Sequence, residues 1–258
     1  MAENETFWTW GNQQKYHTEV KENIETKLTE HIDNTDIHLT AEKAIEAAAT
    51  SISNLNLLDN PDLSINQRGE ESWSPAGEQQ IYTVDRWYVA KCTAIKLASG
   101  GISLAWNGTD GDSGWIQQKI PTTELFGKVV TISADLDGER HSVTATVPTT
   151  ADKTVGGAAN EDSSILFAVS NHGNNLMSVV VFSKVTTPIT IENIKLELSS
   201  QATPFLPPDP ATELAKCQRY YQIRTTGDIN PIDLRPSMRI TPTVTQLDDS
   251  NYAYNAEL

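Results

Sequence analysis

Aromatic side chains beside polar loops are the residues of this sequence best suited, by type and spacing, to bind a ligand. Tryptophan and tyrosine rings stack on the C–H faces of sugar rings, while amide and carboxylate groups hydrogen bond to sugar hydroxyls. Trp73 lies in a polar, turn-rich stretch, and Trp115 follows a loop dense in glycine and polar side chains. Loops on a rigid scaffold commonly carry binding residues. The candidate ligand-binding residues are Trp73, Tyr82, Trp106, Asn107, Asp110, Asp112 and Trp115.

Some of these residues have a purely structural alternative. Trp73 and Trp115 could instead pack at the edge of a core or between subunits. Trp87 follows an apolar alternation and is predicted to be a core residue. Cys92 and Cys217 match no metal-binding spacing and are predicted to be buried free thiols, with a disulfide as the alternative.

Asp110 and Asp112 could support two further kinds of chemistry. Glycoside hydrolysis uses two carboxyl groups that flank the scissile bond. Two acids in one glycine-rich loop more often form a solvated turn or an ion site. A structural calcium ion is therefore an alternative here. The sequence has no nucleophile elbow, phosphate-binding loop, dinucleotide fingerprint or zinc-protease motif. We therefore predict no enzyme activity, no catalytic residues, no metal ligands and no cofactor, with a structural calcium ion as the alternative.

The charge balance limits the partners of the chain. The 258 residues carry a net charge of -15, from 19 basic and 34 acidic residues. Nucleic acid is excluded as an expected partner because a phosphate backbone is repelled by such a surface. No apolar run approaches the roughly 18 residues that a membrane span needs, so membrane insertion is not expected. The N-terminus has no secretory signal pattern, which predicts synthesis in a cytoplasm.

Residues 1–56 are predicted to form a helical stem. Tyr16, Val20, Ile24 and Leu28 recur every four residues and mark one helical face. A second helix is predicted from about Thr40. The apolar stripes are narrow, which favours packing against copies of the same helix as a short coiled coil. The alternative is a helical hairpin that folds onto the chain's own β domain.

Residues 57–206 are predicted to form an antiparallel jelly-roll sandwich. Apolar and polar residues alternate from Lys128 to Leu136, and Asp137-Gly138 then signals a tight turn. Nearly continuous apolar runs at 165–169 and 177–182 are typical of core strands. The alternation slips by one residue at Asn193, which indicates a β-bulge. Many short strands without intervening helices favour a sandwich.

Residues 207–258 are predicted to form a linker and a small C-terminal β extension. A proline-rich stretch at 204–210 precedes a helix-like or extended piece at 212–222. Further β-like pieces surround Met238–Ile240 and Thr243–Thr245. The segment is too short for a robust core, so it is expected to pack on the sandwich or to trimerise. The predicted fold is thus mainly β, with a short N-terminal α-helical stem.

Several stretches resemble proteins of one class. Asn60–Gly69 followed by Tyr82–Trp87 resembles the opening of a jelly-roll domain of phage and prophage tail fibre proteins. The segments that resemble the closing part of such proteins are Ile194–Leu198, Ala202–Phe205, Glu213-Leu214, Cys217–Tyr221, Met238-Arg239, Pro242–Val244 and Asn255–Leu258. His31–Lys43 is similar to a linker in tail proteins of phages of Gram-positive bacteria.

The resemblance implies a function and a set of partners. It implies a homotrimeric tail fibre or receptor-binding protein with a carbohydrate-binding-module-like sandwich that attaches the virion tail to a host cell-surface glycan. Its other partners would be tail or baseplate proteins. The protein would be made in the host cytoplasm and act outside the cell, in the virion tail. The alternatives are a purely structural tail or baseplate adaptor without a receptor site, and a glycan-processing enzyme.

Overall fold

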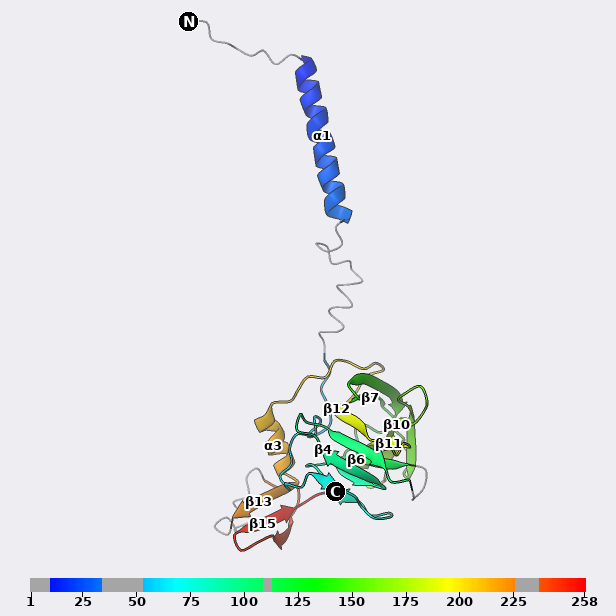
Figure 1. Ribbon diagram of the computed structural model, residues 1–258, viewed down its shortest axis with the longest axis vertical. Helices are drawn as coiled ribbons and strands as arrows, with labels where there is room; N and C mark the ends of the chain where they lie inside the picture. The colour runs from blue at the N-terminus through cyan, green and yellow to red at the C-terminus, as the bar shows by residue number, and fades with distance from the viewer. Residues whose placement is uncertain (1–9, 34–52, 109–112, 226–236) are drawn as a thin grey trace. The chain divides into compact units, whose positions relative to one another are not determined.

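The structure is a computed structural model that describes residues 10–33, 53–108, 113–225 and 237–258 (Figure 1). The chain divides into two compact units, residues 1–52 and 53–258. The domain boundaries predicted from the sequence lie after residues 56 and 206 instead. The extension beyond residue 206 thus belongs to the same compact unit as the sandwich.

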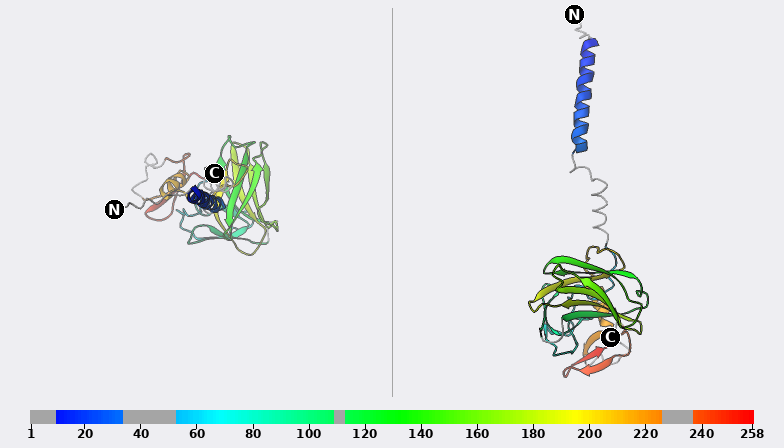
Figure 2. Two further views of the ribbon diagram at one scale, coloured as in Figure 1. Left: turned by 90° about the horizontal axis from the view of Figure 1, so that it is seen from above. Right: turned by 90° about the vertical axis from the view of Figure 1, so that its right-hand side faces the viewer.

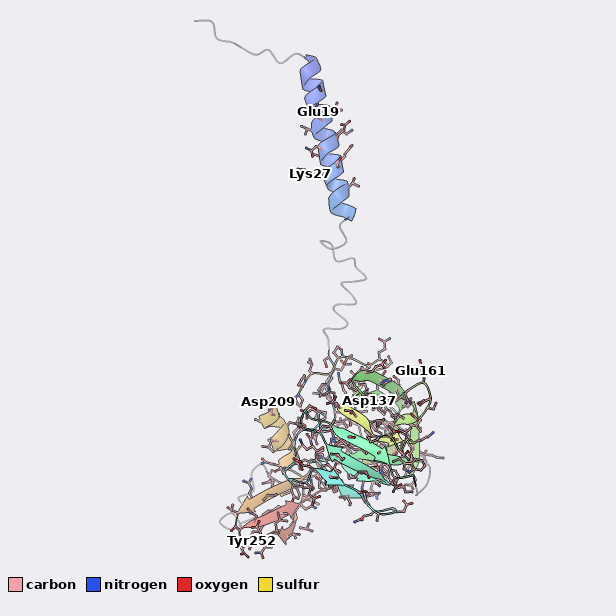
Figure 3. The ribbon with its side chains drawn as sticks, in the orientation of Figure 1. Glu19, Lys27, Asp137, Glu161, Asp209 and Tyr252 are labelled. Carbon is pink, nitrogen blue, oxygen red and sulfur yellow. The ribbon has the colours of Figure 1, made fainter. Side chains whose placement is uncertain are left out.

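The first unit contains one described helix, α1 (Trp10–Asp33). This helix confirms the one predicted from the four-residue periodicity. It ends at Asp33, where the predicted break begins. Lys15 pairs with Glu19, and Val20 and Ile24 are exposed on this helix. Figure 3 shows the side chains that α1 projects from its surface, Glu19 and Lys27 among them. The predicted second helix from Thr40, and His38 in the resembling linker, lie outside the described residues. The coiled coil stays a prediction.

The second unit is built on two six-stranded antiparallel sheets (Figures 1 and 2). In spatial order sheet A contains β1 (Ser72–Trp73), β4 (Cys92–Lys96), β5 (Ile102–Trp106), β12 (Ile189–Glu197), β7 (Val129–Leu136) and β8 (Glu139–Thr146). Sheet B contains β2 (Ile81–Tyr82), β3 (Tyr88–Ala90), β6 (Gly114–Pro121), β11 (Leu176–Ser183), β10 (Ile165–Asn171) and β9 (Lys153–Ala158).

Alternate residues of both sheets meet in one hydrophobic core. Val130 and Ile132 of β7 are fully buried there, together with Val179 and Val181 of β11. Successive side chains of a strand point to opposite faces of the sheet, so each sheet turns one face toward this core and the other face away from it. Trp87 also belongs to this core, as predicted. The observed architecture is therefore a β-sandwich, which confirms the mainly β, antiparallel part of the prediction.

The predicted turn and bulge are both present. Asp137 and Gly138 have φ angles of 49° and 86° between β7 and β8, as a two-residue hairpin turn requires (Figure 3). The register of β12 against β7 shifts between Glu192 and Lys195, and Asn193 there has a φ of 52°. Strand β12 pairs with β5 near its start and with β7 along most of its length.

The C-terminal extension consists of a helix and a small sheet. Helix α3 (Pro210–Gln218) is capped by Asp209, which accepts a hydrogen bond from the Thr212 amide at 2.8 Å. Sheet C follows, with β13 (Tyr221–Thr225), β15 (Asn251–Asn255) and β14 (Thr243–Gln246) in spatial order. The piece predicted at 212–222 therefore begins as a helix and ends in a strand.

A buried arginine joins the extension to the sandwich. Arg86 is 1% exposed and donates hydrogen bonds to Asp59 and Glu257, each at 3.1 Å, and to the Lys119 carbonyl at 2.8 Å. Its guanidinium lies 3.4 Å from the ring centroid of Tyr220. A buried charge is tolerated only when it is paired and hydrogen bonded, and here every partner is supplied by the fold.

A second arginine extends this connection. Arg68 contacts Asp85 and Glu257, each at 3.3 Å, and its guanidinium lies 3.9 Å from the ring centroid of Tyr221. Asp85 also accepts hydrogen bonds from the backbone and side chain of Gln67. Glu257 therefore bridges two arginines of the sandwich, and the extension packs on the sandwich as one of the two expected alternatives.

Asp85 makes the stability of this unit depend on pH. Burial raises the pKa of Asp85 from 3.8 to about 6, against the opposing effects of Gln67 and Arg68. The folded state thus holds this proton more tightly than the unfolded state, so the Asp85 contribution is fully present below pH 3.8 and is lost as the pH rises through about 6. The loss amounts to about 3 kcal/mol, at roughly 1.4 kcal/mol per pKa unit.

Urea unfolding of the wild type and of Asp85→Asn at a series of pH values tests this expectation. Relative to the variant, the wild type should lose about 3 kcal/mol of unfolding free energy between pH 3 and pH 7. Titrating groups that do not interact with Asp85 are common to both proteins and cancel in the difference. A difference that stays constant over this range would contradict the assignment.

Both cysteines are buried and free, as predicted. Burial raises the pKa of the Cys92 thiol to about 12 and also raises that of Cys217. Both thiols are therefore protonated near neutral pH and chemically inert.

Candidate functional site

The part of the outer face of sheet A that lies over β7 and β12 is covered by the chain itself. Thr131 donates to the Ser199 carbonyl at 2.9 Å. Lys195, 1% exposed, donates to Thr203 Oγ1 at 2.6 Å and to the Pro204 carbonyl at 3.0 Å. Glu197 accepts hydrogen bonds from both the amide and the hydroxyl of Thr203. The polar side chains on this part of the face, Thr131, Lys195 and Glu197, already have partners within the chain.

The outer face of sheet B carries aromatic side chains. We use this name for the alternate residues of sheet B that point away from the core. Ala90, Trp115 and Phe182 lie side by side there across β3, β6 and β11. The rings of Trp115 and Phe182 are tilted, with centroids 6.2 Å apart, and both side chains are partly exposed. They form an apolar surface of the kind on which a sugar ring can stack.

A second pair of aromatic residues continues this face toward its edge. Tyr82 of β2 lies opposite Tyr88 of β3, and Tyr88 lies opposite Gln117 of β6. The two tyrosine rings have centroids 5.5 Å apart. The Tyr82 hydroxyl donates to the Leu258 carbonyl at 2.7 Å, which fixes its ring at the border of the extension.

A small hydrogen-bonded group lies beside the aromatic residues. Gln117 donates its side-chain amide to the Ser178 hydroxyl, which also lies 2.8 Å from His172 Nε2. Gln117 Nε2 is 3.3 Å from the same imidazole nitrogen. Burial, and then the charge of Lys119, lower the pKa of His172, while Asp152 raises it. The imidazole is thus neutral near pH 7 and can donate or accept a hydrogen bond.

The predicted ligand-binding residues do not all share one place. Tyr82 and Trp115 lie on the outer face of sheet B. Trp106 continues the alternation of Ile102 and Leu104, which point into the core, so its side chain belongs to the opposite side of sheet A from the covered face. Asn107 directly follows β5, and its backbone N–H donates a hydrogen bond to the Lys91 carbonyl. Asp110 and Asp112 lie outside the described residues.

The structure corrects the ligand-binding assignment of Trp73. Its side chain is only 3% exposed and belongs to the hydrophobic core. Trp73 pairs with Ala94 of β4, and this register turns the indole inward. A buried ring has no open face on which a sugar could stack. The alternative role in packing is therefore the one observed.

Several residues of this face were not predicted from the sequence as ligand-binding residues: Tyr88, Gln117, Lys119, His172, Ser178 and Phe182. Part of the signal was present, because Trp115, Gln117 and Lys119 are spaced two residues apart as on one side of a strand. His172 is isolated in the sequence, and only the pairing of β6 with β11 brings Gln117 close to Ser178.

Among the described residues, no group of three or more His, Cys, Asp or Glu side chains is arranged to hold a metal ion. None of the helices in the described ranges has the length and apolar character needed to cross a bilayer. Comparison with protein family models, curated proteins and solved structures gives no match to this chain.

Proposed function

We propose that this chain is a receptor-binding component of a phage tail whose β-sandwich attaches to a host cell-surface glycan. The observation that carries the proposal is the outer face of sheet B, where partly exposed Trp115 and Phe182 adjoin the polar group of Gln117, Ser178 and His172. Strands hold Trp115, Phe182, Gln117 and Ser178, and His172 directly follows β10, so the surface is already formed before a ligand arrives.

The arrangement fits the two needs of sugar recognition. A sugar ring would stack on Trp115 and Phe182 and bury its C–H face there. Its hydroxyls would exchange hydrogen bonds with the neutral imidazole of exposed His172, which the buried side chains of Gln117 and Ser178 hold in place. Each such site is weak, because a single flat surface buries only part of the sugar, and these contacts must offset the freedom of motion that the sugar loses on binding.

The rest of the proposal concerns assembly. A homotrimer held by the N-terminal stem would present three such sites at once and gain avidity. The exposed Val20 and Ile24 of α1 support an interhelical contact of this kind. The stem would attach to other tail or baseplate proteins of the virion. A jelly-roll relationship is supported by crossings between the sheets from β5 to β6, β6 to β7, β8 to β9 and β11 to β12.

Glycan binding by Trp115→Ala tests the site. Loss of the stacking surface is expected to weaken binding by about 10-fold or more, because it removes aromatic contact area and its stacking energy. A glycan array would identify a ligand, and titration calorimetry with the full chain would measure its dissociation constant. Far-ultraviolet circular dichroism would confirm that the variant is folded.

The control is Ile95→Ala, which removes another exposed apolar side chain, from β4 of sheet A. Its binding should equal that of the wild type. Unchanged binding by the Trp115→Ala, Phe182→Ala double variant would contradict the site. A trimer that binds no glycan would instead favour a structural adaptor.

A further inference from the structure

Strand β14 leaves one edge of sheet C unpaired. It pairs with β15 on one side, and it is the outermost strand of sheet C among the described residues. All four of its residues, Thr243–Gln246, are exposed, and Val244 is 52% exposed. Sheet C projects from the sandwich, with Tyr252 of β15 near its outer end (Figure 3). The backbone N–H and C=O groups along the free edge can therefore pair with another strand.

The other edge strands are protected in ways that β14 is not. Proteins discourage edge-to-edge pairing with very short edge strands or with charged side chains on the edge. Strands β1 and β2 have two residues each. Strands β8, β9 and β13 carry charged residues, which are Glu139 and Arg140, Lys153, and Arg224. Thr243–Gln246 is longer than β1 or β2 and contains no charge, so it lacks both kinds of protection.

The sequence of β14 fits a second copy of itself. Thr243-Val244-Thr245 reads the same in both directions. Two copies that pair antiparallel about a two-fold axis at Val244 place valine opposite valine and threonine opposite threonine. Threonine pairs of this kind stabilise a sheet through hydrogen bonds, and the two exposed valines would shield each other from water.

The charges on either side of β14 favour the same antiparallel arrangement. Arg239 precedes the strand, and Asp248 and Asp249 follow it. Antiparallel pairing about Val244 brings Arg239 of each copy toward the two aspartates of the other copy, whereas parallel pairing would bring like charges together. Residues 240–247 between these charges are all uncharged, so two copies of a chain with a net charge of -15 can approach there with little repulsion.

We infer that β14 is a contact between copies of this chain, in which two β14 strands pair antiparallel about a two-fold axis at Val244. The pairing joins two three-stranded copies of sheet C into one continuous sheet. This inference is independent of the proposed function, and the contact adds to any association through the stem. Four-residue strands form an interface smaller than the standard size, so the two copies should associate and dissociate with concentration.

Sedimentation velocity of the full chain at about 1 to 100 μM tests the contact. The mass of the wild type should rise with concentration toward twice its starting value. Val244→Lys places two ammonium groups against each other at the axis, so this variant should keep the starting mass over the whole range. Val155→Lys is the control, because it makes the same change at a similarly exposed valine of the edge strand β9. It should associate as the wild type does, and circular dichroism would confirm that both variants are folded.

Cysteine variants test the position of the axis without adding charge. Directly opposite residues of paired antiparallel strands have Cβ atoms about 4.5–5.5 Å apart, close enough for a disulfide after a small adjustment. In oxidised glutathione, Val244→Cys should give a covalent dimer on a non-reducing gel, and Val155→Cys should give much less. Cys92 and Cys217 are buried and do not compete.

Three results would overturn the inference. One is a wild-type mass equal to that of Val244→Lys at every concentration. Another is a loss of association in Val155→Lys as well, which would indicate a general effect of charge. The third is a yield of covalent dimer from Val244→Cys no higher than that from Val155→Cys. Glycan binding by the wild type is measured separately, so the proposed function can stand or fail without this contact.

Discussion

Replacing Arg86 with methionine is expected to lower the free energy of unfolding by roughly 3–5 kcal/mol. The reason is the environment of the guanidinium, which is buried between Asp59, Glu257 and the Tyr220 ring. Methionine fills similar space but donates no hydrogen bond, so two carboxylates lose a partner in a poorly hydrated place. Urea denaturation followed by intrinsic fluorescence measures the change.

A comparison and a double variant make this prediction sharper. Arg140→Met breaks a partly exposed pair with Asp135 and should cost less, about 1 kcal/mol, since water replaces the lost contacts. Glu257→Gln in the Arg86→Met background should cost less than Glu257→Gln alone, because the two residues act on each other. If Arg86→Met were within about 1 kcal/mol of the wild type, the bridging role of Arg86 would be wrong.

Trp73→Ala is expected to destabilise the sandwich by roughly 3–5 kcal/mol. The indole is buried among residues of the common core, and alanine would leave a cavity that the surrounding sheets cannot fill. Thermal and urea unfolding measure the loss. This effect on stability replaces the effect on glycan binding that the sequence predicts for this residue.

Two phenylalanine variants distinguish the buried indoles. Trp73 Nε1 is buried without a hydrogen-bond partner among the described residues, so Trp73→Phe removes an unsatisfied donor together with some packing. Trp87 Nε1 donates to the Asn60 carbonyl at 2.9 Å, and Trp87→Phe loses that bond. Trp87→Phe should therefore cost more stability than Trp73→Phe. The reverse order would contradict the assigned environments, and Trp73→Phe should bind glycan as the wild type does.

Local patterns predicted the strands well because their cause is local. Val130, Ile132 and Leu136 face the core because every second residue of a strand points the same way, and one face of sheet A is buried. Asp137-Gly138 predicted the turn because its positive φ angles suit these residue types. The one-residue slip at Asn193 predicted the bulge for the same kind of reason.

Local patterns could not predict which aromatic side chains point into the core and which lie on the outer face of sheet B. Trp73 and Trp115 both stand near polar, glycine-containing stretches, yet one indole points into the core and the other away from it. The difference comes from strand pairing, with Trp73 opposite Ala94 and Trp115 opposite Phe182. Register between distant segments is a non-local property, which a single sequence does not reveal.

The contacts that attach the extension to the sandwich could not be predicted from the sequence either. Arg86 and Glu257 are far apart in sequence, and neither lies in a pattern that indicates a buried pair. Only the possibility that residues 207–258 pack on the sandwich was predictable, because so short a segment cannot form its own core.

Because β12 lies between β5 and β7, sheet A cannot close until Ile189–Glu197 has emerged from the ribosome. Until then β5 and β7 each present an unpaired strand edge, and the apolar side chains of the future core face water. Exposed edges of this kind template association with other chains. A nascent chain halted just before Ile189 is therefore the aggregation-prone species in the synthesis of this protein, and β12 is the strand whose insertion ends that risk.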